Sequence, residues 1–266
     1  MTDQLFDKVN VSATAYLLFS SSPQLRYDSN IGVPFGCPIQ RTCMKTEQQH
    51  REEIVRFGKL LHQAGLVAAT DGNLSVRLEN GTILCTPTLM SKGLMEPEDM
   101  VIVDQQGKQL SGTRGVSSEI AMHLLIYGKR RDIHAVVHAH PPTATGFAAA
   151  GMALDRALCA ELIVTLGSVP LANYETPGTP ELAEALSPLV ADHEAILMAN
   201  HGVVTYGVDL QNAYMNMETV EHFAKIALVT HMLGKQQTIA EHHVDKLREI
   251  RTKYLAHNHA VAQGKD

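Results

Sequence analysis

Apolar residues along the chain follow two spacings, one typical of helices and one typical of strands. Ile54, Phe57 and Leu61 recur at the spacing of a single helix face. They predict a helix from about Thr46 to Gly65, where glycine suits the C-terminal end.

The next segment has the alternation of a strand. Leu74, Val76 and Leu78 are separated by polar residues, as in a strand with one buried face. Asn80-Gly81 then predicts a tight hairpin turn into a second strand. Apolar runs predict further strands at residues 83–85, 101–104, 135–140, 162–166 and 195–198.

Cap residues indicate where the other helices begin. Ser117 or Ser118 is a favourable N-cap, Pro180 suits a first helical position, and Asp209 suits the cap of a long helix. Two more helices are expected at residues 143–150 and 241–255.

Hairpin and crossover signals occur together, and no linker interrupts the chain after residue 45. We therefore expect one α/β domain over residues 45–258, with helices on the faces of a largely antiparallel central sheet. Residues 1–44 contain several Ser, Gly and Pro breakers and are expected to form a loosely structured N-terminal extension. Residues 259–266 are expected to be a flexible tail.

Composition excludes several classes of protein. The 266 residues are 45% hydrophobic and 19% charged, as in a globular domain. A net charge of −6 offers no basic surface for nucleic acid, and no apolar run approaches the ~20 residues of a membrane span. The four cysteines lack C-x-x-C spacing, which argues against a disulfide framework or a cysteine zinc site and fits a reducing cytoplasm.

His138 and His140 stand two residues apart at the end of a predicted strand, directly before Pro141-Pro142. Side chains two apart on a strand point to the same face, so the two imidazoles can converge on one point. Proline has no N–H for the ladder, so the strand must end there. The pair suggests a metal site at a strand end, although two unrelated histidines are the simpler alternative.

Two more residues could complete such a site. His201 follows the strand at 195–198, and Glu119 lies in the first turn of the helix after Ser117-Ser118. Three imidazoles and a carboxylate suit Zn²⁺ or a related divalent ion. Each residue also has an ordinary interpretation, since Asn-His-Gly is a common turn and glutamate favours helix N-termini.

Small residues with hydroxyl or amide groups and accessible N–H groups form a possible anion site at the turns. They are Gly72, Asn73, Thr86, Thr88, Ser117 and Ser118. The start of a helix at Ser117-Ser118 adds the positive end of the helix dipole, which suits a phosphate. Each is also a common turn or cap residue. Lys92 is interpreted as a solvated loop lysine rather than as part of this site.

Taken together, these motifs resemble the class II aldolase/adducin family, most closely its L-fuculose-1-phosphate aldolase branch and related ketose-phosphate aldolases. The resemblance covers about residues 45–256, in order and spacing. The motifs are TDGNLSVR (70–77), TPT (86–88), SSE (117–119), HAHPPTATG (138–146) and NHGVVTYG (200–207).

The resemblance implies a three-layer α/β/α fold with a mainly antiparallel central sheet, and a homotetramer with active sites at subunit interfaces. It implies Zn²⁺, or another divalent ion such as Mn or Co, bound by Glu119, His138, His140 and His201. It also implies phosphate binding by Gly72, Asn73, Thr88, Ser117 and Ser118.

The activity implied is zinc-dependent cleavage of a ketose 1-phosphate to dihydroxyacetone phosphate and an aldehyde, with Glu119 as a catalytic group. A decarboxylase, dehydratase or epimerase acting on a sugar phosphate through the same metal enolate is the alternative, and an adducin-like interaction module is the non-enzymatic one. That module predicts loss of the four metal-site residues, which this chain retains.

The sequence departs from the branch at two places. Leu89 stands where the fuculose enzyme has glycine, and the segment 158–161 lacks the catalytic tyrosine expected about there. Glu161 or Tyr254, which resembles the family's tail tyrosine, is therefore the candidate for the second catalytic group.

Overall fold

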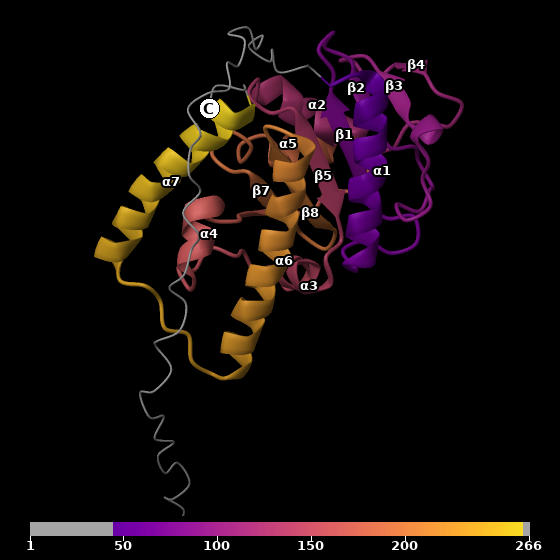
Figure 1. Cartoon of the computed structure of the whole chain (residues 1–266). Coiled ribbons are helices and arrows are strands. Elements are labelled where there is room, and N and C mark those ends of the chain that lie inside the picture. The colour runs from indigo at the N-terminus through magenta and orange to yellow at the C-terminus, as the bar shows by residue number, and fades with distance from the viewer. Residues whose placement is uncertain (1–44, 263–266) are drawn as a thin grey trace, which may run out of the picture. The chain divides into compact units, whose positions relative to one another are not determined.

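The computed structural model describes residues 45–262, and its centre is one eight-stranded sheet (Figure 1). The strand order is β4-β3-β2-β1-β5-β8-β7-β6, and all neighbouring pairs are antiparallel except β6 and β7. The strands are β1 (Asn73–Arg77), β2 (Ile83–Cys85), β3 (Val101–Val103), β4 (Gln109–Ser111), β5 (Ala135–Ala139), β6 (Leu171–Ala172), β7 (Ala195–Met198) and β8 (Gly202–Gly207).

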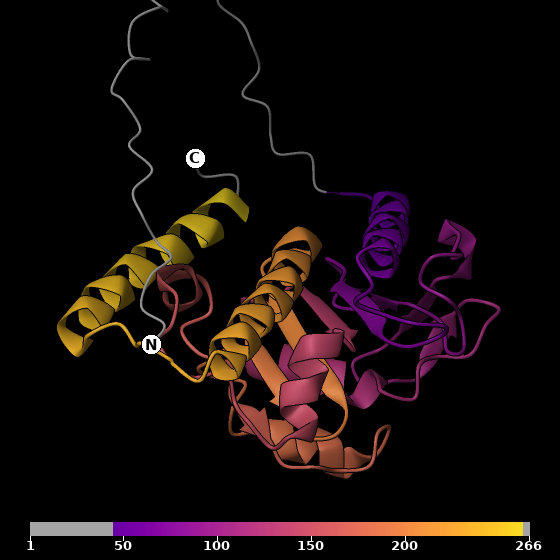
Figure 2. The ribbon, with the colours of Figure 1, turned by 90° about the horizontal axis from the view of Figure 1, so that it is seen from below.

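The helices lie on both faces of the sheet and complete a three-layer arrangement. They are α1 (Glu47–Gln63), α2 (Ile120–Lys129), α3 (Pro142–Ala149), α4 (Ala160–Thr165), α5 (Pro180–Leu186), α6 (Leu210–Met232) and α7 (Glu241–Ala262), with one 3-10 turn at Pro97–Asp99. Figure 2 shows α1 and α6 packed beside each other on one side of the sheet.

Alternation along the buried strands sends side chains into two separate cores. In β5, Val137 belongs to the core that includes residues of α1, α3, α4 and α6, whereas Val136 belongs to the core that includes residues of α2 and α5. This is the two-sided burial expected of a sheet covered by helices, and it confirms the predicted α/β/α fold class. Within residues 45–262, no helix is both long and apolar enough to cross a membrane.

Most local predictions in the first half of the chain are confirmed. Thr46 caps α1 by accepting from the backbone N–H of Gln49, and the Asn80-Gly81 turn joins β1 to β2. At α2 the structure differs, because the N-cap position is Glu119 and neither serine is the cap residue. Ser117 instead accepts from the backbone N–H of Glu119, at 3.3 Å.

The strand predicted at residues 162–166 is wrong, because this run belongs to helix α4. Leu162 and Ile163 are the buried residues of α4, and Leu166, also buried, is its C-cap residue one turn after Leu162. The last helix also continues beyond its expected end at about Leu255, to Ala262. The predicted extension 1–44 lies outside the described residues.

Candidate metal centre and active site

Two neighbouring strands bring the three candidate histidines together. His138 is paired with Asn73 of β1 on one side and Val204 of β8 on the other, at the end of β5. His201 stands directly before β8, which runs antiparallel beside β5. As a result, the ring centroids of His138, His140 and His201 lie 4.8 to 5.1 Å apart.

The ring nitrogens of this cluster point toward one another. One candidate ligand nitrogen from each ring lies within 4.8 Å of the others, and the Nε2 atoms of His138 and His140 are 3.1 Å apart. His138 Nδ1 donates to the Val203 carbonyl at 2.8 Å, so Nε2 of that ring carries a lone pair. Such a backbone partner orients a histidine that binds a metal.

The Glu119 carboxylate lies against the cluster. Its Oε2 is 3.3 Å from His138 Nε2, and its Oε1 is 3.1 Å from His201 Nε2. Within the described residues, Glu119 Oε1 and His201 Nδ1 are buried without a hydrogen-bond partner. Buried polar atoms are rarely left unpaired, so an unpartnered carboxylate oxygen facing imidazoles marks a position for a further ligand.

The charge state of the cluster also suits a cation. Burial lowers the pKa of His138 to about 3, and burial lowers the pKa of His140 as well. Burial opposes ionisation of Glu119, but the facing His138 and His201 outweigh it, so the pKa of Glu119 lies below its ordinary value. Imidazole nitrogens and an ionised carboxylate are the donor set that binds Zn²⁺ and related divalent ions, so these four residues fit such an ion.

The predicted phosphate-binding residues come from turns next to this cluster. Asn73 donates from Nδ2 to Glu119 Oε2 at 2.8 Å, which links the Gly72-Asn73 turn to the start of α2. On the other side of α2's start, the N–H of Thr88 donates to the carbonyl of Gly115 at 3.0 Å, beside the segment that leads to Ser117-Ser118. Thr86 differs, because its buried hydroxyl accepts from the N–H of Leu74 and is committed to the fold.

Residues 52–228 match the family described as Class II Aldolase and Adducin N-terminal domain. The chain belongs to this class II aldolase and adducin family. It is 37% identical to a 5-deoxy-D-ribulose 1-phosphate aldolase of Bacillus thuringiensis serovar kurstaki, over 75% of this chain and 94% of that protein. It is 36% identical to a 3-oxo-tetronate 4-phosphate decarboxylase of Escherichia coli K12, over 70% of this chain and 89% of that protein.

Solved structures give the same family. An L-fuculose 1-phosphate aldolase superposes with a TM-score of 0.71 at 32% identity, and the match covers 75% of this chain and 94% of that one. The relatives' names therefore include both aldolases and decarboxylases of sugar phosphates.

For two residues of this class II aldolase/adducin domain, Lys92 and Leu89, the structure adds to or corrects what the sequence predicted. Lys92 is buried, with 1% of its surface exposed, rather than solvated, and it donates to the carbonyls of Thr70 and Met90 at 2.9 and 2.5 Å. It ties the loop before Gly72-Asn73 to the loop that follows Thr88. Leu89 has a backbone φ of +55°, the left-handed region that glycine favours, and its side chain is 82% exposed.

The two remaining candidates lie elsewhere in the fold. Glu161 is exposed on α4, and Tyr254 is half-buried on α7, which packs against α4. Among the described residues of one chain, neither makes a hydrogen bond or ion pair with the histidine cluster. The structure thus gathers Glu119 and the histidines but does not bring Glu161 or Tyr254 to them.

Two polar neighbours of the cluster lay outside the predicted set. Asp71 Oδ2 is 3.4 Å from His140 Nδ1, and the His123 ring contacts Asn73 behind Glu119. The signal for His123 was its spacing, because position 123 lies one helical turn after Glu119, the N-cap residue of α2.

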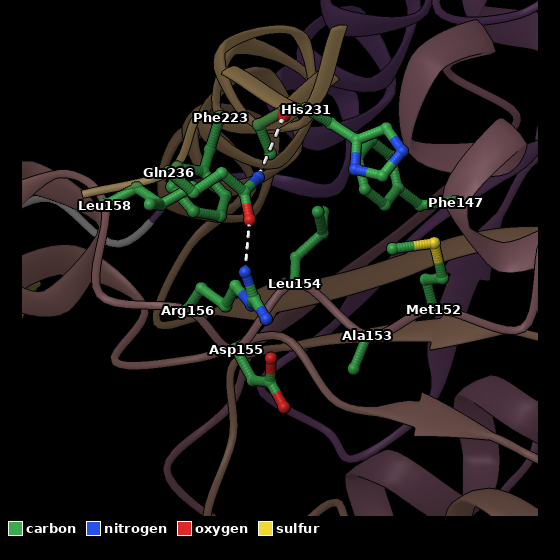
Figure 3. A pocket seen from close by; sticks show the side chains of 11 residues that line it. Phe147, Met152, Ala153, Leu154, Asp155, Arg156, Leu158, Phe223, His231 and Gln236 are labelled. Carbon is green, nitrogen blue, oxygen red and sulfur yellow. Dashed lines mark hydrogen bonds between the residues drawn. The ribbon is translucent and has the colours of Figure 1, made fainter. Parts of the chain in front are cut away.

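A separate cavity of about 380 Å³ lies between α6, the end of α3 and the segment after it (Figure 3). Phe147, Leu154 and Phe223 give it an apolar wall, and Arg156 donates to the Gln236 amide at its rim. None of the four metal-site residues lines it, so it is not part of the candidate active site.

Proposed function

We propose that this protein is a zinc-dependent aldolase that cleaves a ketose 1-phosphate to dihydroxyacetone phosphate and an aldehyde. One observation carries the proposal: the half-buried carboxylate of Glu119, with a buried oxygen that has no hydrogen-bond partner, faces three converging imidazoles. Relatives named as 5-deoxy-D-ribulose 1-phosphate aldolase and L-fuculose phosphate aldolase support it.

The substrate phosphate would bind between the Gly72-Asn73 turn, Thr88 and Ser117-Ser118. The hydroxyls of Thr88, Ser117 and Ser118 are suitable donors, and α2 directs the positive end of its dipole toward Ser117-Ser118. A phosphate fixed there would place the carbon atoms of the sugar beside Glu119.

Glu119, His138, His140 and His201 would hold the metal. When bound, Zn²⁺, or Mn²⁺ or Co²⁺ in its place, supplies Lewis-acid stabilisation of the negative charge that develops on substrate oxygens. Glu119 would move a proton at substrate C3, and the Asn73 amide keeps its carboxylate oriented. General acid–base help of this kind contributes roughly 10²–10⁴-fold.

A second group must take the proton of the C4 hydroxyl when the C3–C4 bond breaks. Glu161 and Tyr254 of the same chain make no contact with the cluster, so either would serve from a neighbouring copy. This fits a homotetramer with active sites at its subunit interfaces. The free thiols Cys85 and Cys159 suit a reducing compartment, and we assign the enzyme to the cytoplasm.

A decarboxylase is the second candidate, favoured by the 36% identity to a 3-oxo-tetronate 4-phosphate decarboxylase. Loss of carbon dioxide leaves the same kind of enolate, so Glu119 and the phosphate cradle would serve either reaction. The products differ, since an aldolase releases an aldehyde and a decarboxylase releases carbon dioxide.

The deciding experiment is a product assay on the full chain with added Zn²⁺, with and without chelator. The substrates are the 1-phosphates of L-fuculose and 5-deoxy-D-ribulose, and 3-oxo-tetronate 4-phosphate. Chelator-sensitive release of an aldehyde together with dihydroxyacetone phosphate from a ketose 1-phosphate is expected, and Glu119→Gln should abolish it. Release of carbon dioxide with dihydroxyacetone phosphate from 3-oxo-tetronate 4-phosphate, without cleavage of either ketose 1-phosphate, would favour the decarboxylase, and full activity of Glu119→Gln would contradict the role of this carboxylate.

A further inference from the structure

A buried chain of hydrogen bonds begins at Glu119 and runs away from the metal centre. Asn73 donates from Nδ2 to Glu119 Oε2 at 2.8 Å. The other end of the same amide, Oδ1, lies 2.5 Å from His123 Nε2. Both ends of the Asn73 amide are therefore engaged, one by Glu119 and one by His123.

The chain continues into the core on the α2 face of the sheet. His123 Nδ1 is 2.7 Å from Ser75 Oγ, which is 2.9 Å from the Tyr127 hydroxyl. Ser75, His123 and Tyr127 are at most 4% exposed. They face one another because residues 123 and 127 lie one turn apart on α2, Glu119 is the N-cap residue one turn before His123, and 73 and 75 share one face of β1.

The partners fix where each proton lies. The Asn73 carbonyl oxygen can only accept, so the hydrogen of the His123 ring must be on Nε2. His123 Nδ1 then accepts from the Ser75 hydroxyl, and Ser75 Oγ accepts from Tyr127. At the other end, an ionised Glu119 accepts from the Asn73 NH₂ group. Every bond points toward Glu119, so the chain has one consistent direction.

We propose that His123 is a positioning residue, which holds the Asn73 amide with its NH₂ group toward Glu119 and so fixes the orientation of that carboxylate. The inference rests on the proposed lyase function, in which Glu119 acts on the substrate. His123 itself touches neither the histidine cluster nor the space beside it.

Without the Nε2–H group of His123, no hydrogen bond to Oδ1 would fix the orientation of the Asn73 amide. A rotated amide would present Oδ1 to the Glu119 oxygen at hydrogen-bond distance, and two acceptors repel each other. Burial lowers the pKa of His123 to about 4, so the ring is neutral at physiological pH, as the direction of the chain requires.

Two substitutions of similar size separate the N–H group from simple packing. His123→Gln keeps an amide N–H near the position of Nε2, whereas His123→Met has no donor. In the full-length zinc-loaded enzyme, with 5-deoxy-D-ribulose 1-phosphate and 3-oxo-tetronate 4-phosphate as probes, His123→Met should lower kcat about 10–100-fold, the range for an outer neighbour of a metal ligand. KM should change much less, and His123→Gln should recover most of kcat.

Each outcome discriminates. Wild-type activity with an equally active His123→Met overturns this inference alone, and so does a folded His123→Gln as impaired as His123→Met. A wild type inactive on both probes overturns the proposed function and this inference with it. If His123→Met does not fold, long-range ¹H–¹⁵N spectra of the wild-type imidazoles provide the test: an Nδ1–H or doubly protonated His123 overturns the inference, and a neutral Nε2–H ring supports it.

Discussion

A Cβ atom on Gly72 would lie 2.6 Å from the carbonyl oxygen of His138 and 2.8 Å from Val67 Cγ1. Gly72 also has a φ of +74°, which side chains rarely tolerate. The absence of a side chain at this turn is what lets β1 approach the strand that carries His138.

Gly72→Ala should therefore lower both stability and activity. The left-handed backbone alone costs an alanine about 1–2 kcal/mol, and the clash with His138 adds to this. Gly65→Ala is the matched control, because Gly65 has a φ of +68° but no atom within 4 Å of its Cβ position. The midpoint temperature of thermal unfolding of the control should fall by roughly 2–8 °C. Gly72→Ala should fall further and lose bound zinc, and equal behaviour of the two variants would contradict this account.

Substitution of Leu89 by glycine should have the opposite effect and increase stability. Its φ of +55° costs a leucine about 1–2 kcal/mol, and its exposed side chain returns little by burial. Glycine relieves that strain but loses about 0.5–1 kcal/mol through the entropy of the unfolded chain. Leu89→Gly should raise the midpoint of thermal unfolding by about 2 °C.

The control for Leu89 is Leu94, which is 74% exposed and has no positive φ. Leu94→Gly carries the entropic loss without any relief of strain, so its midpoint should fall. A fall in both variants would show that Leu89 is not strained.

The local part of the site was predictable from sequence and the non-local part was not. His138 and His140 converge because residues two apart on a strand always share a face. His201 and Glu119 reach them only through the antiparallel pairing of β5 with β8 and the placement of α2, which the family motifs indicated but spacing did not.

The same distinction between local and long-range contacts explains the two wrong predictions, the strand at 162–166 and the exposure of Lys92. The run 162–166 is short, apolar and rich in branched residues, so its local pattern suits a strand as well as a helix. The run packs against α7, some eighty residues later in the chain, and this long-range packing favours the helix α4 over a strand. Lys92 was predicted to be solvated because lysine side chains are usually exposed. One of the two carbonyls that accept its hydrogen bonds belongs to Thr70, which is distant in sequence.

Lys92 gives a prediction about pH. Burial lowers the pKa of its amine to about 8 from an ordinary value of 10.5. Between these pH values the unfolded chain binds more protons than the folded one, so this group makes stability rise with pH. Relative to Lys92→Met, the free energy of unfolding of the wild type should increase from pH 8 to 10 by up to about 1.4 kcal/mol per unit.

Denaturant unfolding of both proteins across this range measures the difference. A wild-type advantage that is flat, or that falls, between pH 8 and 10 would mean that Lys92 is not a desolvated charge.

Removal of the metal is the most direct prediction for the site. Full-length protein prepared without chelator should carry about one divalent ion per chain, measured by mass spectrometry of the elements. Dialysis against chelator should abolish lyase activity and lower thermal stability, because an ion that binds only the folded state stabilises it. Added Zn²⁺ should restore both.

Histidine variants assign that ion to the cluster. His140→Ala and His201→Ala should lose metal and reduce activity by more than the ~10–100-fold expected for an outer neighbour of a ligand. His231→Ala is the control, because His231 lines the separate cavity beside α6 and contacts none of the cluster. It should retain its metal content. Normal zinc content in His201→Ala, together with normal folding, would place the ion elsewhere and overturn the assignment.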